Sequence, residues 1–295
     1  MSPNVASLPM PGPTPSAALA RLRDPRPLIA VEMRPPQAGL SSAQSMNTWI
    51  DMYHAVRRLA ANDTIVFITD NAVGQAEEEN LGHLAGNLAG DVNPAKVVPF
   101  LTAKHSLDYC LMYAARAVSH GFDTLTVLGG DKSVGPPRCV EFAWQLRKII
   151  REKVPGATLG GWANPLHDHS AQVDYLLQKD FTAEFYLTQI VSHHSIREVE
   201  QFLAEARRRG VNHPAVFGVF HYLSANRSTL ERLGRFFPVP IEGVTKDFAA
   251  GMKPEEITAK TIRALRDVGV DKVYVSNLGF KRPEERYRKI VEALG

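Results

Sequence analysis

The segment Thr124-Leu-Thr-Val-Leu-Gly-Gly-Asp-Lys132 carries the pattern that decides the fold. Its first five residues are apolar or β-branched, which favours a short buried strand. Gly129 and Gly130 then remove two side chains, and Asp131 places a carboxylate directly after them. An apolar strand that ends in bare backbone and an acid is typical of the carboxyl end of a strand in a parallel-sheet enzyme. A simple turn, with Asp131 capping the next helix, is the alternative that this segment leaves open.

The same strand-then-helix pattern recurs along the chain at about 30 residues, the size of a βα unit. We expect eight strands, at Leu28–Met33, Thr64–Thr69, Lys96–Leu101, Thr124–Leu128, Ala157–Trp162, Glu184–Gln189, Ala215–Phe220 and Lys272–Asn277. Helices are predicted at Gln44–Ala61, Glu77–Ala89, Leu107–Ser119, Arg138–Lys153, Ser170–Lys179, Ile196–Arg209, Ser228–Phe237, Lys253–Val268 and Pro283–Leu294. Eight such units predict an α/β fold, a single (β/α)8 TIM barrel over residues 26–295.

An open, doubly wound sheet is the competing fold. It would need a G-x-G-x-x-G turn after its first strand to bind a dinucleotide. The first strand runs instead into Glu32-Met-Arg-Pro-Pro36, and Gly86-Asn-Leu-Ala-Gly90 lies inside a helical pattern. The segment Ile241–Ala250 interrupts the βα pattern and is predicted as a loop or a short helix.

Composition excludes several classes of protein. The 295 residues are 44% hydrophobic and 22% charged, as in soluble globular proteins. The net charge of +3 is spread along the chain without a basic arm, so we expect no nucleic-acid partner. No apolar run approaches the roughly 20 residues of a membrane span, and no signal peptide is recognisable. We therefore expect a cytoplasmic protein without a membrane partner, in which Cys110 and Cys139 are free thiols.

The N-terminal residues 1–25 differ from the rest of the chain. They contain six prolines among small residues. Such a segment buries little apolar surface, so we expect a loose tail before the barrel, with a short helix at Ala17–Arg23 as an option.

Polar residues collect at the predicted carboxyl ends of the strands, where barrel enzymes carry their chemistry. Glu32 ends an apolar strand, and a partly desolvated carboxyl there is suited to act as a general acid. Pairing with Arg34 is the structural alternative. The remaining polar residues at the strand ends are Thr69, Asp70, Asn71, Thr102, Asp131, Asn164, Gln189, His221 and Asn277.

Histidines also cluster in the sequence, at His167-Asp-His169, at His193-His194 and at His221. A matching third ligand is missing from the pattern, so no metal site is predicted.

These motifs together resemble methylenetetrahydrofolate reductase. The matching segments occur in the family's order over about 250 residues: Val31-Glu-Met-Arg-Pro-Pro36, Ile68-Thr-Asp-Asn-Ala72, Leu128-Gly-Gly-Asp131, Asn164-Pro165, Thr188-Gln189 and Val275-Ser-Asn277. The resemblance implies a (β/α)8 enzyme that reduces 5,10-methylenetetrahydrofolate to 5-methyltetrahydrofolate.

The resemblance also implies roles for single residues. Glu32 is expected to act as the acid that opens the imidazolidine ring of the folate, and Asp131 as the acid that holds the pterin near the hydride-transfer site. Gln189 and Asn277 are expected to bind the substrate. The residues assigned to the cofactor are Thr69, Asp70, Gly129 and Asn164.

Several positions depart from the flavin-binding members of the family. Those members have an arginine at the position of Gly129 and a histidine at that of Phe100, and only Lys179 remains of a basic pair on the fifth helix. Each lost charge-assisted phosphate contact removes about 1.5–3 kcal/mol. The chain therefore resembles the flavin-independent branch. NADH or NADPH is expected to give its hydride directly to the folate, and FAD to bind weakly or not at all.

Two alternatives remain open at this stage. One is an FAD-dependent reductase whose flavin contacts have moved. The other is a non-catalytic barrel that binds a folate and serves a methyltransferase; a binding protein, however, does not need the proton donor Glu32. The expected partner is a small-molecule folate, and a homo-oligomer is compatible with the sequence.

Overall fold

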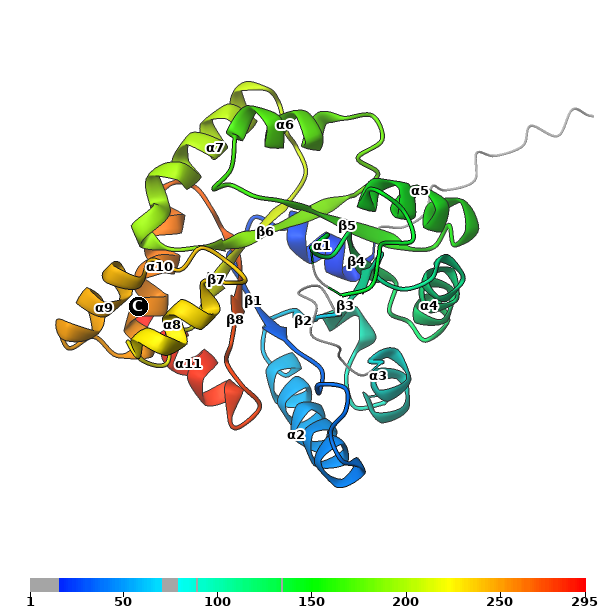
Figure 1. The fold of residues 1–295 in the computed structure, drawn as a ribbon, viewed down its shortest axis with the longest axis horizontal. Helices are drawn as coiled ribbons and strands as arrows, with labels where there is room; N and C mark the ends of the chain where they lie inside the picture. The colour runs from blue at the N-terminus through cyan, green and yellow to red at the C-terminus, as the bar shows by residue number, and fades with distance from the viewer. Residues whose placement is uncertain (1–15, 71–78, 89, 134) are drawn as a thin grey trace, which may run out of the picture.

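The computed structural model describes residues 16–70, 79–88, 90–133 and 135–295. Eight parallel strands form a closed barrel in which each strand pairs with the next in the chain and β8 pairs with β1 (Figure 1). The strands are β1 Leu28–Met33, β2 Val66–Ile68, β3 Val97–Thr102, β4 Thr124–Leu128, β5 Thr158–Ala163, β6 Phe185–Val191, β7 Ala215–Phe220 and β8 Lys272–Ser276. The predicted TIM barrel is confirmed.

Helices surround the strands, as Figure 1 shows. They are α1 Ala17–Arg23, α2 Ser42–Ala60, α3 Leu81–Leu88, α4 Leu107–Ser119, α5 Ala143–Lys153, α6 His169–Leu177, α7 Ile196–Arg208, α8 Arg227–Leu233, α9 Ile241–Ala249, α10 Pro254–Asp267 and α11 Pro283–Leu294. Two short 3-10 helices, η1 Pro94–Lys96 and η2 His193–Ser195, precede β3 and α7. No helix among these combines the length and apolar character that a membrane span requires.

The fourth predicted helix of the barrel begins later than expected. The apolar spacing predicts a start at Arg138, but α5 begins at Ala143. The main-chain N–H of Phe142 donates to Gln145 Oε1 at 2.9 Å, so the first turn is capped at Phe142. Residues 138–142 therefore belong to the loop between β4 and α5. The predicted start of the helix at Glu77 lies outside the described residues.

The strands alternate between two apolar layers because successive side chains point to opposite faces. On β1, Ile29 and Val31 belong to the layer between the barrel and its helices. Leu28 and Ala30 belong to the core inside the barrel. Glu32 has the same parity as Leu28 and Ala30, so its carboxyl points inward at the end of the strand.

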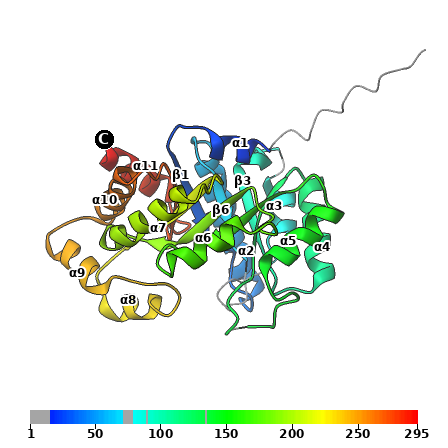
Figure 2. The same ribbon diagram turned by 90° about the horizontal axis from the view of Figure 1, so that it is seen from above.

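Helix α1 closes the opposite end of the barrel. It lies on the far side from α8 (Figure 2), and its Leu19 and Leu22 are each only 3% exposed. Both leucines join the core inside the barrel. Residues 16–25 are therefore part of the fold rather than of a loose tail, because this helix covers the apolar end of the barrel. Residues 1–15 lie outside the described part of the chain.

Candidate active site at the mouth of the barrel

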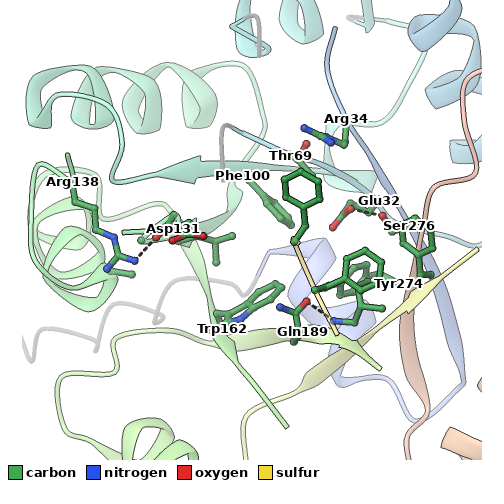
Figure 3. Close-up of a pocket in the computed structure, with 18 of the residues that line it drawn as sticks. Glu32, Arg34, Thr69, Phe100, Asp131, Arg138, Trp162, Gln189, Tyr274 and Ser276 are labelled. Carbon is green, nitrogen blue, oxygen red and sulfur yellow. Dashed lines mark hydrogen bonds between the residues drawn. The ribbon is translucent and has the colours of Figure 1, made fainter. Parts of the chain in front are cut away.

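A cavity of about 590 Å³ lies at the carboxyl ends of the strands. Five of the residues predicted for the site line it, from four different strands or the loops that follow them. They are Glu32, Thr69, Gly129, Asp131 and Gln189. Figure 3 shows Glu32 and Thr69 on one side of this cavity, Asp131 on another, and Gln189 between them on the wall formed by β6.

Glu32 is half-buried and is held by its neighbour on β8. Ser276 lies opposite Glu32 in the β1–β8 pairing, and its hydroxyl donates to Glu32 Oε1 at 2.6 Å. Both side chains point into the barrel because each follows the inward parity of its strand. The register of the β1–β8 pairing therefore places Ser276 beside Glu32, and the hydrogen bond between them orients the carboxyl toward the cavity.

Asp131 is exposed at the rim of the cavity. Its Oδ1 accepts hydrogen bonds from the main-chain N–H of Ser133 at 2.9 Å and from the Ser133 hydroxyl at 2.8 Å. The bond from the main-chain N–H, followed by the bond from the hydroxyl, lowers the pKa of Asp131 below its usual value. At neutral pH the side chain is a carboxylate, suited to hold a hydrogen-bond donor or a developing cation rather than to supply a proton.

Gln189 lies at an irregularity in the sheet. The β6–β7 register shifts between Leu187 and Ile190, and such bulges re-aim side chains next to active sites. The oxygen Oε1 of Gln189 accepts from the main-chain N–H of Ile190 at 2.8 Å. This leaves the amide NH2 of Gln189 as the group it presents to a ligand.

Gly129 and Gly130 make room for two basic side chains. A β-carbon on Gly129 would come within 2.7 Å of Arg138 Cζ, and one on Gly130 within 2.8 Å of Lys104 Cγ. The Arg138 guanidinium donates to the main-chain oxygen of Gly130, as Figure 3 shows, and to that of Glu141 at 3.1 Å. A cation therefore does lie beside Gly129, where the sequence pattern indicated a missing arginine.

Lys104 is only 6% exposed, and its ammonium group donates to Pro136 O at 2.9 Å. Gly130 has a backbone φ of +73°, a left-handed conformation that glycine adopts without strain. Glycine at this position therefore allows both the left-handed backbone conformation and the close approach of the Lys104 side chain.

Aromatic side chains form much of the remaining wall. Flat aromatic walls with a few polar groups are typical of sites for heteroaromatic ligands. Sequence reasoning missed these residues, although the alternation along β3 and β8 places Phe100 and Tyr274 on the inward face. The aromatic residues that line the cavity are Phe100, Phe142, Trp162, Tyr175, Phe220, Phe236, Phe237 and Tyr274.

Arg147 also borders the cavity but has a structural role. Its guanidinium is fully buried and donates to Phe181 O, to Val127 O and to the Tyr175 hydroxyl. Burial lowers the pKa of Arg147 from its usual value. These bonds tie α5 to the ends of β4 and the loop before β6.

Three predicted site residues do not line the cavity. Asp70 turns toward β3: it accepts from the Thr102 N–H at 2.7 Å, and His105 Nε2 lies 2.8 Å from its Oδ1. The N–H and the imidazole of the next βα unit thus bind this carboxylate, and its predicted contact with the cofactor stays a prediction.

Asn164 and Asn277 likewise hold the main chain. Asn164 Oδ1 accepts from the Leu166 N–H at 3.1 Å. Asn277 adopts a φ of +74° and donates to His221 O at 3.0 Å. Both side chains make hydrogen bonds in the loops that follow their strands, where Asn is favoured for such local bonds, and their predicted contacts with the cofactor and the substrate stay predictions.

Comparison with known proteins supports the fold. No protein-family model and no curated protein matches the sequence. An uncharacterized protein from Clostridium thermocellum that binds two copies of 5-methyl-5,6,7,8-tetrahydrofolic acid superposes with a TM-score of 0.63, at 16% identity over 91% of this chain and 94% of that one. Apo-MsnO8 superposes with a TM-score of 0.57, at 12% identity over 91% and 98% of the two chains. At these identities the likeness is one of fold.

Proposed function

We propose that this protein reduces 5,10-methylenetetrahydrofolate to 5-methyltetrahydrofolate with a hydride from NADH or NADPH. One observation carries the proposal: Glu32, Asp131 and Gln189, which match the reductase pattern in sequence, line a single cavity. The Clostridium thermocellum barrel of similar fold binds the product of this reaction, which supports a folate ligand.

The reaction requires one proton and one hydride. Protonation of N10 by Glu32 breaks the bond between N10 and the methylene carbon, which leaves an iminium between that carbon and N5. Bound NADH or NADPH would supply the hydride that reduces the methylene carbon to the N5-methyl group and would itself be oxidised. Glu32 regains its proton from solvent. Such general acid catalysis contributes about 10²–10⁴-fold in rate.

The other side chains of the cavity bind and orient in this scheme. The carboxylate of Asp131 holds N–H groups of the pterin and stabilises the cationic iminium electrostatically. The amide NH2 of Gln189 donates to a pterin acceptor. Trp162 and Phe220 present ring surfaces against which the pterin and the nicotinamide can stack.

We assign the cofactor to the part of the cavity between Thr69, which follows β2, and Gly129, which follows β4. Arg138 and Arg34 also line the cavity and can pair with the phosphates of a dinucleotide. We propose direct transfer from the nicotinamide without FAD. The position of Arg138 beside Gly129 favours the second candidate, an FAD-dependent reductase with relocated contacts, because it restores a cation where flavin-binding members have one.

A direct assay separates these possibilities. The purified protein is mixed with NADH or NADPH and 5,10-methylenetetrahydrofolate, with and without added FAD, and oxidation of the nicotinamide is followed by absorbance. Folate-dependent oxidation without FAD, by a protein whose visible spectrum lacks a flavin band, is the expected result. A stoichiometric flavin band, or activity only with FAD, identifies the second candidate. Folate binding without any oxidation overturns the reductase assignment.

The role of Glu32 is tested by Glu32→Gln. We expect kcat to fall by at least about 100-fold, because the amide cannot supply the proton. Glu292→Gln, a change to an exposed carboxyl on α11 that pairs with Arg288, is the matched control and should retain full activity. Near-normal turnover of Glu32→Gln with an intact fold refutes the assignment.

A further inference from the structure

A second cluster of side chains with metal-binding chemistry lies outside the cavity at the mouth. It joins three elements: η2, which follows β6 and carries His193 and His194; α9, which carries Asp247; and α10, which carries Lys260 and Thr261. Helices α9 and α10 lie on the same side of the barrel in Figure 1. The cluster therefore forms only when three separate segments fold together.

Two imidazoles converge on one carboxylate oxygen in this cluster. His193 Nε2 lies 2.9 Å from Asp247 Oδ2, and His194 Nε2 lies 2.8 Å from the same atom. These three ligand atoms all lie within 4.8 Å of one another. The sequence pattern lacks a third ligand beside these histidines and so indicates no metal site, but the fold supplies that ligand in Asp247.

We propose that His193, His194 and Asp247 bind one divalent transition-metal ion, with Zn²⁺ as the expected occupant. Two imidazole nitrogens and one carboxylate oxygen are a common three-residue ligand set for zinc, and a water completes the tetrahedron. Metal–ligand distances of about 2.0–2.2 Å place such ligand atoms roughly 3.3 Å apart. Each imidazole nitrogen therefore needs to move only about half an ångström farther from Asp247 Oδ2 to reach this spacing.

The surroundings of the histidines resemble those of metal ligands. A ligating histidine generally donates its other ring N–H to a fixed acceptor. His193 Nδ1 lies 2.8 Å from Thr261 Oγ1, and that hydroxyl can in turn donate to Ile257 O, at 3.2 Å.

The fold leaves space for the second imidazole as well. A β-carbon on Gly243 would lie within 2.7 Å of the ring of His194. The His194 side chain is 26% exposed, whereas those of His193 and Asp247 are 8% and 6% exposed. An ion can thus reach the cluster from the His194 side and be held by two groups that are already desolvated.

The positive charge of Lys260 opposes the binding of an ion. Its ammonium group donates to Asp247 Oδ1 at 2.8 Å, so it orients the carboxylate but also neutralises part of its charge. Without a metal, the same four groups form a hydrogen-bonded bracket that holds α9 to α10. The metal site and the bracket predict different results for Lys260→Met. A metal site should bind the ion more tightly in this variant, whereas a bracket should bind no metal.

The test is metal content. The full chain is stripped with a chelator, dialysed against Zn²⁺ and analysed for bound metal, and Co²⁺ is used in parallel because its visible absorption reports four-coordinate geometry. We expect one ion per chain, none in Asp247→Asn or His194→Gln, and several-fold tighter binding in Lys260→Met. Thr261→Val should weaken binding about 10–100-fold.

The control is His167→Gln, a change to an exposed histidine in the loop between β5 and α6, which should keep the ion. Circular dichroism verifies the fold of each variant, and His194→Gln serves if the more buried Asp247→Asn does not fold. Absence of stoichiometric metal from the unmodified chain, or equal retention by His194→Gln, overturns the proposal.

Discussion

The guanidinium of Arg138 lies against the backbone of Gly129, so close that a β-carbon at position 129 would be 2.7 Å from Arg138 Cζ. The cationic group comes from the loop between β4 and α5, and the absent side chain is at the end of β4. In the sequence, Gly129 reads as the loss of an arginine. In the structure it is the reason that another arginine fits.

Replacement of Gly129 by alanine should therefore affect ligand binding more than stability. The new methyl group meets the far end of a flexible side chain, so the guanidinium can move aside at little cost in the free energy of unfolding. The displaced guanidinium no longer reaches the same position in the cavity, and we expect about tenfold weaker binding of NADH, the size of one charge-assisted contact. Isothermal titration measures this affinity.

Arg138→Met should produce the same loss, and the double variant should lose little more, because both changes remove one contact. Gly156→Ala is the control, since a β-carbon there meets only Val118 Cγ1 at an ordinary 3.5 Å. Fully additive losses in the double variant would show that Gly129 and Arg138 act separately.

Ser276→Ala should lower kcat with little change in KM. The Ser276 hydroxyl, 2.6 Å from Glu32 Oε1, orients the proposed acid and has no part in holding the folate in the proposed scheme. Loss of one hydrogen bond to the carboxylate that forms as Glu32 gives up its proton corresponds to about 1.5 kcal/mol, or roughly tenfold in rate. Steady-state kinetics with Ser276→Ala and Ser276→Thr check the role: threonine keeps the hydroxyl and should restore most of the rate. Equal loss with threonine would contradict it.

The stability of the fold should decrease as the pH falls below about 6.5. His221 is fully buried, and burial lowers its pKa to about 4. Between pH 6.5 and 4 the unfolded chain binds a proton at this histidine that the folded chain does not, so protonation favours unfolding there. Above pH 6.5 the contribution is complete, and it is lost progressively down to about pH 4, by at most about 3 kcal/mol.

Denaturant titrations at several pH values measure this dependence. His221→Asn can keep a hydrogen bond to Thr258, which lies 2.9 Å from His221 Nδ1, but it cannot titrate, so its stability should depend less on pH. His167→Asn, at an exposed position, should leave the slope unchanged. An unaltered slope in His221→Asn would exclude this histidine as the source.

Leu22→Ala should destabilise the fold by about 2–5 kcal/mol, as expected for a buried leucine. Leu22 is 3% exposed and fills the end of the barrel opposite the cavity, together with Leu19. Thermal or denaturant unfolding measures the change. Met46→Ala, on the exposed face of α2 with Met46 63% exposed, should cost little. A similarly small effect of Leu22→Ala would mean that α1 contributes nothing to the barrel core.

Local sequence patterns predicted the bounds of those helices and strands in which the apolar spacing and the residues at the ends indicate the same start and end. The bounds of β1, β4, β7, α4 and α11 are those predicted. The start of α5 was misplaced because helical spacing says nothing of where the loop above β4 ends.

The same contrast holds in the site. Glu32 was identified because its position at the end of an apolar strand can be read from neighbouring residues, and it lines the cavity. Asp70 was assigned to the cofactor from a motif alone, yet its carboxylate binds Thr102 and His105 of the next βα unit. The direction of a side chain at a strand end depends on such neighbours, which the motif does not contain.

The sequence by itself determined the barrel, the position of Glu32 at the end of a strand and the polar strand ends, because residue periodicity and β-branched runs act over a few residues. Only the tertiary structure decided which cations lie at the mouth and which groups meet around Asp247. Those contacts join loops and helices far apart in the chain, and their geometry depends on the packing of whole βα units. Gly129 illustrates both levels. Its position at the end of β4 is determined by the local sequence, but the reason for a glycine there depends on where the tertiary structure places Arg138.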